Sequence, residues 1–190
     1  MTKEKPAIII SSPSGGGKGT IIRRLMQNNP RLALSVSATT RPMREGEKHG
    51  VDYYFLSVEE FRQKIKEGEV VEWEEVYPGK MYGTLRSELE RLWADGKIII
   101  FEIDVNGAMH LREEFGDEAL LMYITPPSLE VLEQRLRERG TEDPESFQVR
   151  MQRAEYELSF QKEFDVVIMN DDLETAVADA EQAISEFLGK

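Results

Sequence analysis

The residues best suited to chemistry lie near the N-terminus, where an apolar run leads into a glycine-rich turn. The turn reads Ser12-Pro13-Ser14-Gly15-Gly16-Gly17-Lys18-Gly19-Thr20 and follows the apolar segment 7–11. Consecutive glycines let backbone N–H groups converge on an anion, and the N-terminus of a following helix adds partial positive charge. Lys18 adds a full charge. The pattern predicts a loop that binds the phosphates of a nucleotide.

This loop departs twice from the phosphate-loop pattern GxxxxGK[ST]. Ser12 stands where the first glycine belongs, and Gly19 stands where a hydroxyl usually helps to bind Mg²⁺. Thr20 follows directly, so its hydroxyl could reach a phosphate, while waters and phosphate oxygens would hold more of the metal. The plainer alternative is a glycine-rich turn with a surface lysine. The apolar run before the turn and the helical run after it favour the phosphate loop.

Composition limits the classes of protein that this chain can belong to. Its 190 residues, 40% of them hydrophobic, suffice for one substantial core with insertions. The absence of cysteine excludes disulfides and thiolate metal sites, and no apolar run or N-terminal segment suggests a membrane span or signal peptide. A net charge of -12 disfavours binding to nucleic acid or anionic membranes. We expect a cytoplasmic protein with neither partner.

Short apolar runs alternate with longer segments of helical period, which is the pattern of a parallel sheet covered by helices. The buried strands are expected at 7–11, 32–36, 98–103, 120–124 and 166–169. The helices are expected at 18–29, 87–95, 128–139, 144–162 and 172–188. The sequence therefore predicts an α/β fold with a three-layer core.

Two regions interrupt this alternation. The first is 37–85, with strand-like pieces at 53–56 and 70–75 and a capping box formed by Ser57 and Glu60. The second is the short turn 139–143 between two arginine-bearing helices. Open α/β sheets bind ligands beyond the carboxyl ends of their strands, so such inserts can close over a bound nucleotide.

Several blocks in a fixed order resemble the guanylate kinase family, from about residue 7 to the C-terminus. They lie at 12–18, 35–41, 50–55, 72–73, 82–84, 102–107, 135–140 and 170–172. The resemblance implies a P-loop core (1–36, 86–138 and 154–190), a GMP-binding lobe (37–85) and a short lid (139–153). It also implies phosphoryl transfer from Mg-ATP to GMP, giving ADP and GDP for purine nucleotide metabolism.

The resemblance assigns two groups of residues to GMP. Those expected at its phosphate are Arg41, Arg44, Tyr53 and Tyr82. Those expected around guanine are Ser37, Glu72, Thr84 and Asp104. Guanidinium forks suit a phosphate, and a carboxylate can accept both N–H groups of guanine but would be unpaired against adenine. Spacing alone cannot choose among Glu72, Glu74 and Glu75, whereas the resemblance chooses Glu72.

The same resemblance implies the ATP site. Segment 14–20 would wrap the phosphates, Lys18 would bridge toward the transferred group, and Arg139 with Arg150 would neutralise its charge. Arg135 would stack on adenine and Asn170 would lie near it, although Asn170 could simply be a strand-end turn residue. Arg137 and Arg153 are weaker candidates.

Glu102 ends a strongly apolar strand, where an acidic residue is costly unless paired or near a ligand. We expect it to organise Mg²⁺ through water, although the family commonly has Asp here.

Three other classes share parts of this pattern. A P-loop GTPase fits segment 104–107 as DxxG, but no NKxD motif follows. Adenylate kinase fits the loop but not the blocks of the GMP lobe. Guanylate-kinase-like scaffold domains bind proteins and typically lose the loop lysine, whereas Lys18 is present here.

Overall fold

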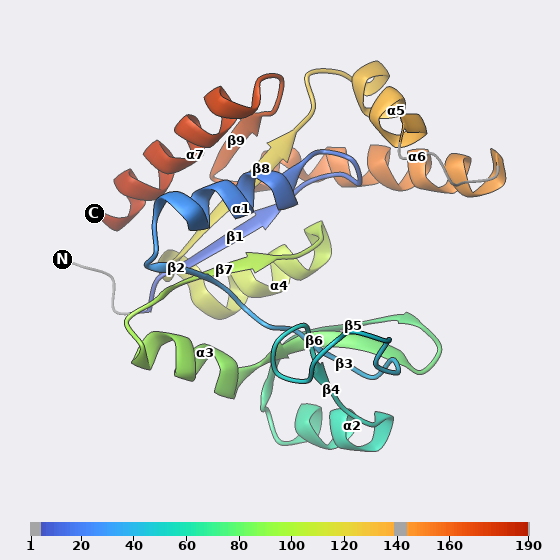
Figure 1. The fold of residues 1–190 in the computed structure, drawn as a ribbon, viewed down its shortest axis with the longest axis vertical. Helices are drawn as coiled ribbons and strands as arrows, with labels where there is room; N and C mark the ends of the chain where they lie inside the picture. Colours follow the sequence, from blue (N-terminus) through green and yellow to red (C-terminus); the bar gives the residue numbers. More distant parts are fainter. Residues whose placement is uncertain (1–4, 139–143, 190) are drawn as a thin grey trace.

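Five parallel strands form the central sheet of the computed structural model, which describes residues 5–138 and 144–189. In spatial order they run β2-β7-β1-β8-β9 (Figure 1). Their bounds are β1 Ala7–Ser11, β2 Leu32–Leu34, β7 Ile98–Glu102, β8 Ala119–Thr125 and β9 Val166–Met169. Every residue of the central strand β1 is buried, as expected for a strand covered on both faces. The five strands confirm the sequence prediction, with ends that differ by two residues at most.

Helices cover both faces of this sheet (Figure 1). Helices α1 (Lys18–Asn28) and α7 (Leu173–Leu188) pack on one face, where Ile21, Leu25 and Ile184 are buried. Helices α3 (Arg86–Ala94) and α4 (Val105–Phe115) pack on the other. The remaining helices are α5 Leu129–Glu138 and α6 Pro144–Ser159, with the short η1 Gly116–Glu118 and η2 Phe160–Glu163. The predicted three-layer α/β core is confirmed.

Helix α4 was not predicted from the sequence. Asn106 and Gly107, in its first turn, are poor helix formers. The structure compensates in two ways. The side chain of Asp104 accepts a hydrogen bond from the Gly107 amide at 2.9 Å and so caps the helix, and Ala108 and Leu111 are buried against the sheet.

The segment 37–85 builds a second sheet with its own small core. Its spatial order is β4-β3-β6-β5, with α2 packed against it (Figure 1). The bounds are β3 Ala38–Thr39, β4 Tyr54–Phe55, α2 Val58–Lys66, β5 Val70–Tyr77 and β6 Lys80–Leu85. The capping box of α2 is confirmed, since Ser57 accepts from the Glu60 amide and Glu60 from the Ser57 amide. Strand β6 was missed.

A buried carboxylate joins this second sheet to the central one. Glu88 of α3 is 1% exposed and accepts hydrogen bonds from the Tyr54 hydroxyl at 2.8 Å and from the Val36 amide at 3.3 Å. Arg91 donates to both of its oxygens at 2.9 Å. The two sheets are therefore tied together where the chain passes between them.

No helix within 5–138 or 144–189 is both long and apolar enough to cross a membrane.

Candidate functional site

The glycine-rich loop leaves the carboxyl end of β1 and lines a cavity of about 240 Å³. The lining includes Ser14, Gly15, Gly17, Lys18, Gly19, Thr20 and Glu102. The loop turns tightly, because the Gly16 amide donates to the Pro13 carbonyl at 2.8 Å. No side chain caps the N-terminus of α1, and its first turn holds no acidic residue. The helix therefore presents its positive end to the cavity, as an anion site requires.

Asn170, which directly follows β9, holds this loop through a hydrogen bond. It is 8% exposed, and its Nδ2 donates to the Gly16 carbonyl at 2.8 Å. A Cβ atom at Gly17, whose φ is 93°, would collide with that amide. Arg135 of α5 in turn donates to the Asn170 carbonyl at 2.9 Å. Asn170 and Arg135 therefore fix the position of the loop.

Lys18 and Glu102 face each other at the mouth of this cavity, with Nζ 3.7 Å from Oε1. Both side chains are partly exposed, at 25% and 38%. Glu102 also lines a second, larger cavity, so the two cavities meet at this carboxylate. Among the described residues, no three His, Cys, Asp or Glu side chains are grouped to hold a metal ion.

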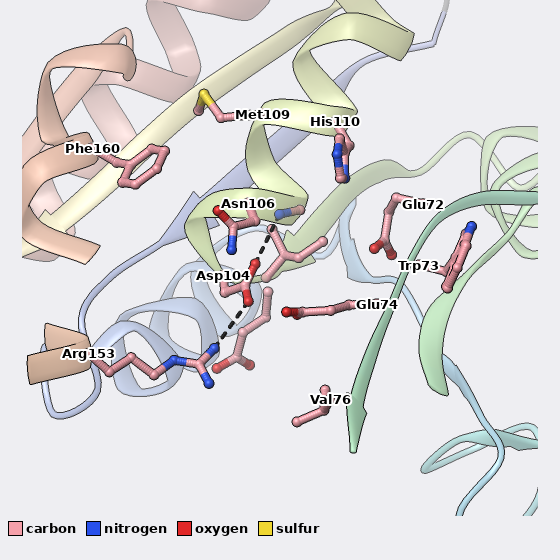
Figure 2. A pocket seen from close by; sticks show the side chains of 13 residues that line it. Glu72, Trp73, Glu74, Val76, Asp104, Asn106, Met109, His110, Arg153 and Phe160 are labelled. Carbon is pink, nitrogen blue, oxygen red and sulfur yellow. Dashed lines mark hydrogen bonds and ion pairs between the residues drawn. The ribbon is translucent and has the colours of Figure 1, made fainter. Parts of the chain in front are cut away.

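The second cavity, of about 590 Å³, lies between β5 of the smaller sheet and the N-terminus of α4 (Figure 2). Glu72 of β5 points into it, is 9% exposed and accepts a hydrogen bond from the Thr84 hydroxyl at 2.7 Å. Burial raises the pKa of Glu72 to about 7. The hydrogen bond from Thr84 lowers this pKa, and the negative charges of Asp104 and Glu74 raise it further. A neutral Glu72 in the empty cavity can become an anion when N–H donors arrive.

Asp104, Glu74 and Arg153 line the same cavity as Glu72 (Figure 2). Asp104 caps α4 with one oxygen and accepts from Arg153 of α6 with the other, at 3.2 Å. Glu74, two residues along β5 from Glu72, has a pKa raised by burial and by Asp104 and lowered by Arg153. The guanidinium of Arg153 thus offsets the negative charge of the cavity.

A separate cationic group lies on the loop after β3. Arg41 is 9% exposed, and its Nη1 donates to Glu47 at 2.8 Å while Nη2 donates to the other oxygen of the same carboxylate. Its guanidinium carbon lies 4.9 Å from the centre of the Tyr53 ring, which makes an edge contact with Tyr82 at 6.1 Å. The structure therefore brings Arg41, Tyr53 and Tyr82 together.

The structure describes three further predicted residues, Ser37, Arg44 and Arg150, and neither cavity includes them in its lining. The Arg44 amide donates to Glu47 at 2.7 Å, and the Ser37 carbonyl accepts from the Tyr54 amide at 2.9 Å. Arg150 is an exposed residue of α6. Arg139 lies outside the described residues.

Comparisons with known proteins identify the family of this chain. The family model for guanylate kinase matches residues 3–187. The chain belongs to the guanylate kinase family. A guanylate kinase of Bacteroides fragilis is 50% identical over 99% of this chain and 92% of its own length. One of Porphyromonas gingivalis is 47% identical over the whole of both chains.

A solved guanylate kinase supports the same assignment in three dimensions. The crystal structure of the enzyme from Anaplasma phagocytophilum is 32% identical and has a TM-score of 0.75, covering 100% of this chain and 89% of that one. The resemblance seen in the sequence blocks is thus confirmed, and it extends to the fold.

Two residues of this guanylate kinase chain were missed by sequence reasoning. Glu47 holds Arg41, and Glu157 of α6 accepts from the Ser14 amide of the phosphate loop at 3.2 Å. Arg153 and Glu157 are four residues apart on a predicted helix, and this spacing indicates an ion pair. Nothing in the local sequence indicates that Glu157 reaches the loop.

Proposed function

We propose that the protein transfers the γ-phosphoryl group of Mg-ATP to GMP, giving ADP and GDP for purine nucleotide metabolism. The observation that carries this proposal is the meeting of the two cavities at Glu102. One cavity has the positive helix end and lysine that suit a triphosphate, and the other has a buried carboxylate that suits a base with N–H donors. A reaction between the two ligands needs such adjacency.

The second cavity favours guanine over adenine. In the ionised state, Glu72 can accept the N1 and N2 N–H groups of guanine, and the Thr84 hydroxyl bonded to it at 2.7 Å keeps it oriented. Adenine would leave the buried carboxylate unpaired, at a cost of about 1 to 3 kcal/mol or more. We assign Ser37 and Asp104 to the same base site, and Arg41, Arg44, Tyr53 and Tyr82 to the phosphate of GMP.

Transfer needs alignment and charge rather than a general base. An anionic oxygen of the GMP phosphate attacks the γ-phosphorus, the bond from that phosphorus to the β–γ bridging oxygen breaks, and ADP leaves with the electron pair. We assign Lys18 and the remaining amides of segment 14–20 to the ATP phosphates, because the Ser14, Gly16 and Thr20 amides already donate within the protein. We assign Arg139 and Arg150 to the charge of the transferred group, and Arg135 with Asn170 to the adenine side of the loop.

The residues around Glu102 fit a hydrated Mg²⁺ ion. Mg²⁺ usually keeps several waters and binds through one or two carboxylates together with substrate phosphates. Glu102 is partly exposed beside the phosphate loop, and Thr20 lines the same cavity. When bound with ATP, the ion would neutralise phosphate charge.

The division of the chain follows from these assignments. We propose that 37–85 is the GMP-binding lobe, since it has its own sheet and apolar cluster, and that 139–153 acts as a lid. Residues 144–153 belong to α6, and 139–143 lie outside the described residues. We also propose a cytoplasmic enzyme that binds neither membrane nor nucleic acid, consistent with a cysteine-free chain of net charge -12.

The decisive experiment measures ADP formation from Mg-ATP with GMP, AMP, CMP, UMP or no acceptor, for the wild type and Glu72→Gln. Strong stimulation by GMP alone, reduced in the variant, is the expected result. The control is Glu75→Gln, which changes an exposed carboxylate of the same strand. Stimulation by AMP would refute the base assignment, and no stimulation by any acceptor would favour a GTPase or a scaffold domain.

A further inference from the structure

Helix α6 carries a buried carboxylate that has no part in the proposed transfer. Glu157 is 5% exposed, and its Oε2 accepts a hydrogen bond from the Ser14 amide at 3.2 Å. Its Oε1 accepts from Nε of Arg153, one helical turn earlier, at 3.0 Å. Burying a carboxylate is costly unless it is paired and hydrogen-bonded, so both partners are needed to keep Glu157 in place.

A second nitrogen of the Arg153 guanidinium bonds Asp104, a residue that lines the other cavity. Its Nη2 donates to Oδ2 of Asp104 at 3.2 Å, and Oδ1 of Asp104 accepts from the Gly107 amide at 2.9 Å (Figure 2). A continuous series of hydrogen bonds therefore runs from Ser14 through Glu157, Arg153 and Asp104 to the start of α4. It begins at the phosphate loop and ends beside Glu72, in the base cavity.

The charge of Arg153 matters as much as its geometry. Bonding to Glu157 raises the pKa of Arg153, burial opposes this, and the charges of Glu157, Asp104 and Glu74 raise it further. On the opposite wall, Arg153 lowers the pKa of Glu74 against the raising by burial and by Asp104. Removing the guanidinium would leave Asp104 without its hydrogen bond from Arg153 and would take a positive charge from the wall of the base cavity.

We propose that Arg153 and Glu157 are positioning residues that couple the two nucleotide sites. This rests on the proposed function, in which Ser14 belongs to the ATP site and Asp104 to the guanine site. The two positioning residues lie one turn apart on α6 and are bonded to each other at 3.0 Å, so a nucleotide that fixes the loop at Ser14 also fixes Arg153 against Asp104. Each nucleotide then binds more tightly when the other is present, and by the same factor.

A helix-stabilising ion pair would behave differently from such a coupling device. Loss of the pair alone would lower the melting temperature and leave the ratio of GMP affinities with and without the ATP analogue unchanged. Lysine at position 153 separates charge from geometry, because an ammonium keeps the positive charge but lacks the planar fork that reaches two carboxylates. Arg153→Lys should therefore retain GMP affinity and lose the coupling.

The experiment is calorimetric titration of GMP, with and without saturating Mg²⁺ and adenylyl imidodiphosphate, for the wild type, Arg153→Met, Arg153→Lys and Glu157→Gln. In the wild type, we expect GMP to bind at least about fivefold more tightly with the analogue, within the usual range of coupling. The ratio should fall below about twofold in all three variants. In Arg153→Met, GMP alone should also bind about three- to tenfold more weakly, because Asp104 loses its counter-charge.

The matched control is Arg24→Met, which removes an exposed ion pair between α1 and Glu174 of α7 at 2.7 Å. It should keep the wild-type ratio. The Arg153 side chain is 52% exposed, so its variants should fold, and melting curves check this. If Glu157→Gln does not fold, the two Arg153 variants alone test the coupling. A wild-type ratio near one, or an unchanged ratio in the Arg153 variants, overturns the coupling. A wild type that does not bind GMP in either titration instead refutes the proposed function.

Discussion

The protonation of Glu72 should make GMP affinity depend on pH. Because burial raises the pKa of Glu72 to about 7, a neutral form of Glu72 is populated near neutral pH, whereas the proposed pairing with guanine uses the anion. The GMP dissociation constant should therefore rise about tenfold as the pH falls from 8 to 6. Calorimetric titration across this range measures the effect. Glu72→Gln should retain only the pH dependence of the GMP phosphate, and an identical slope in both proteins would contradict the prediction.

The same carboxyl affects stability in the opposite direction. Because the folded-state pKa of Glu72 lies above its ordinary value of 4.5, the native state holds the proton more tightly than the unfolded chain. Its stabilising contribution is complete below pH 4.5 and is lost as the pH rises through about 7. In the proposed complex, binding of GMP near neutral pH would therefore use the charged form that burial disfavours.

Glu47 is expected to orient Arg41 for the phosphate of GMP. The bond from Arg41, followed by that from the Arg44 amide, lowers the pKa of Glu47 to about 2, so it is ionised at neutral pH. Arg41 uses two N–H groups for Glu47 and one for the Pro42 carbonyl, and it also bonds Tyr82, which leaves at least one of its five N–H groups for a phosphate. Glu47→Gln should raise the KM for GMP about tenfold with little change in kcat.

Steady-state kinetics tests this role of Glu47, with Glu45→Gln as the control because it removes an exposed carboxylate from the same loop. An unchanged KM for GMP in Glu47→Gln would mean that Arg41 needs no orientation. A lower KM would mean that the Glu47 carboxylate competes with the phosphate.

At the scale of elements, α3 should hold the proposed GMP-binding lobe (37–85) through Glu88. Burial raises the pKa of Glu88, but bonds from Arg91, Tyr54 and Val36 outweigh this and lower it overall. The contribution to stability is therefore present above the ordinary pKa and is lost as the pH falls through the lowered folded-state value. Tyr54→Phe should cost about 1 kcal/mol of unfolding free energy, and Glu88→Ala about 2 to 3 kcal/mol.

Urea unfolding at pH 7 and pH 4 measures these costs. The exposed neighbour Glu90→Ala is the control on the same helix. The deficit of Glu88→Ala should be smaller at pH 4 than at pH 7. A deficit that is equal at both values would show that the charge of Glu88 is not what stabilises the junction.

The elements divide into those that local sequence specifies and those that need the whole fold. Strand β1 and the loop after it could be predicted because an apolar run and a glycine turn are contiguous. Strand β6 and helix α4 could not be predicted, because a glycine in each weakens the local pattern. Gly83 packs closely against Glu72 and Trp73 of the neighbouring strand, and Gly107 packs against Ile103. The contact of Glu157 with Ser14 spans 143 residues, so no local spacing could have revealed it.

At the scale of the whole molecule, GMP should join two bodies that have separate apolar cores. The lobe buries Phe61 and Met81, whereas the central sheet buries its own clusters on both faces. In the proposed complex, guanine lies between Glu72 of the lobe and Asp104 of the core, so bound GMP opposes their separation. Ligand at 100 times its Kd stabilises the folded state by about 2.7 kcal/mol.

For a chain of this length, that energy corresponds to a rise in Tm of about 5 to 10 °C, which scanning calorimetry detects directly. AMP at the same concentration should give a much smaller rise, because adenine leaves Glu72 unpaired. In Glu72→Gln the GMP shift should shrink, while Glu75→Gln should keep it, since Glu75 is an exposed carboxylate of the same strand. Equal shifts with GMP and AMP would mean that the phosphate alone joins the two bodies and that the base cavity does not discriminate.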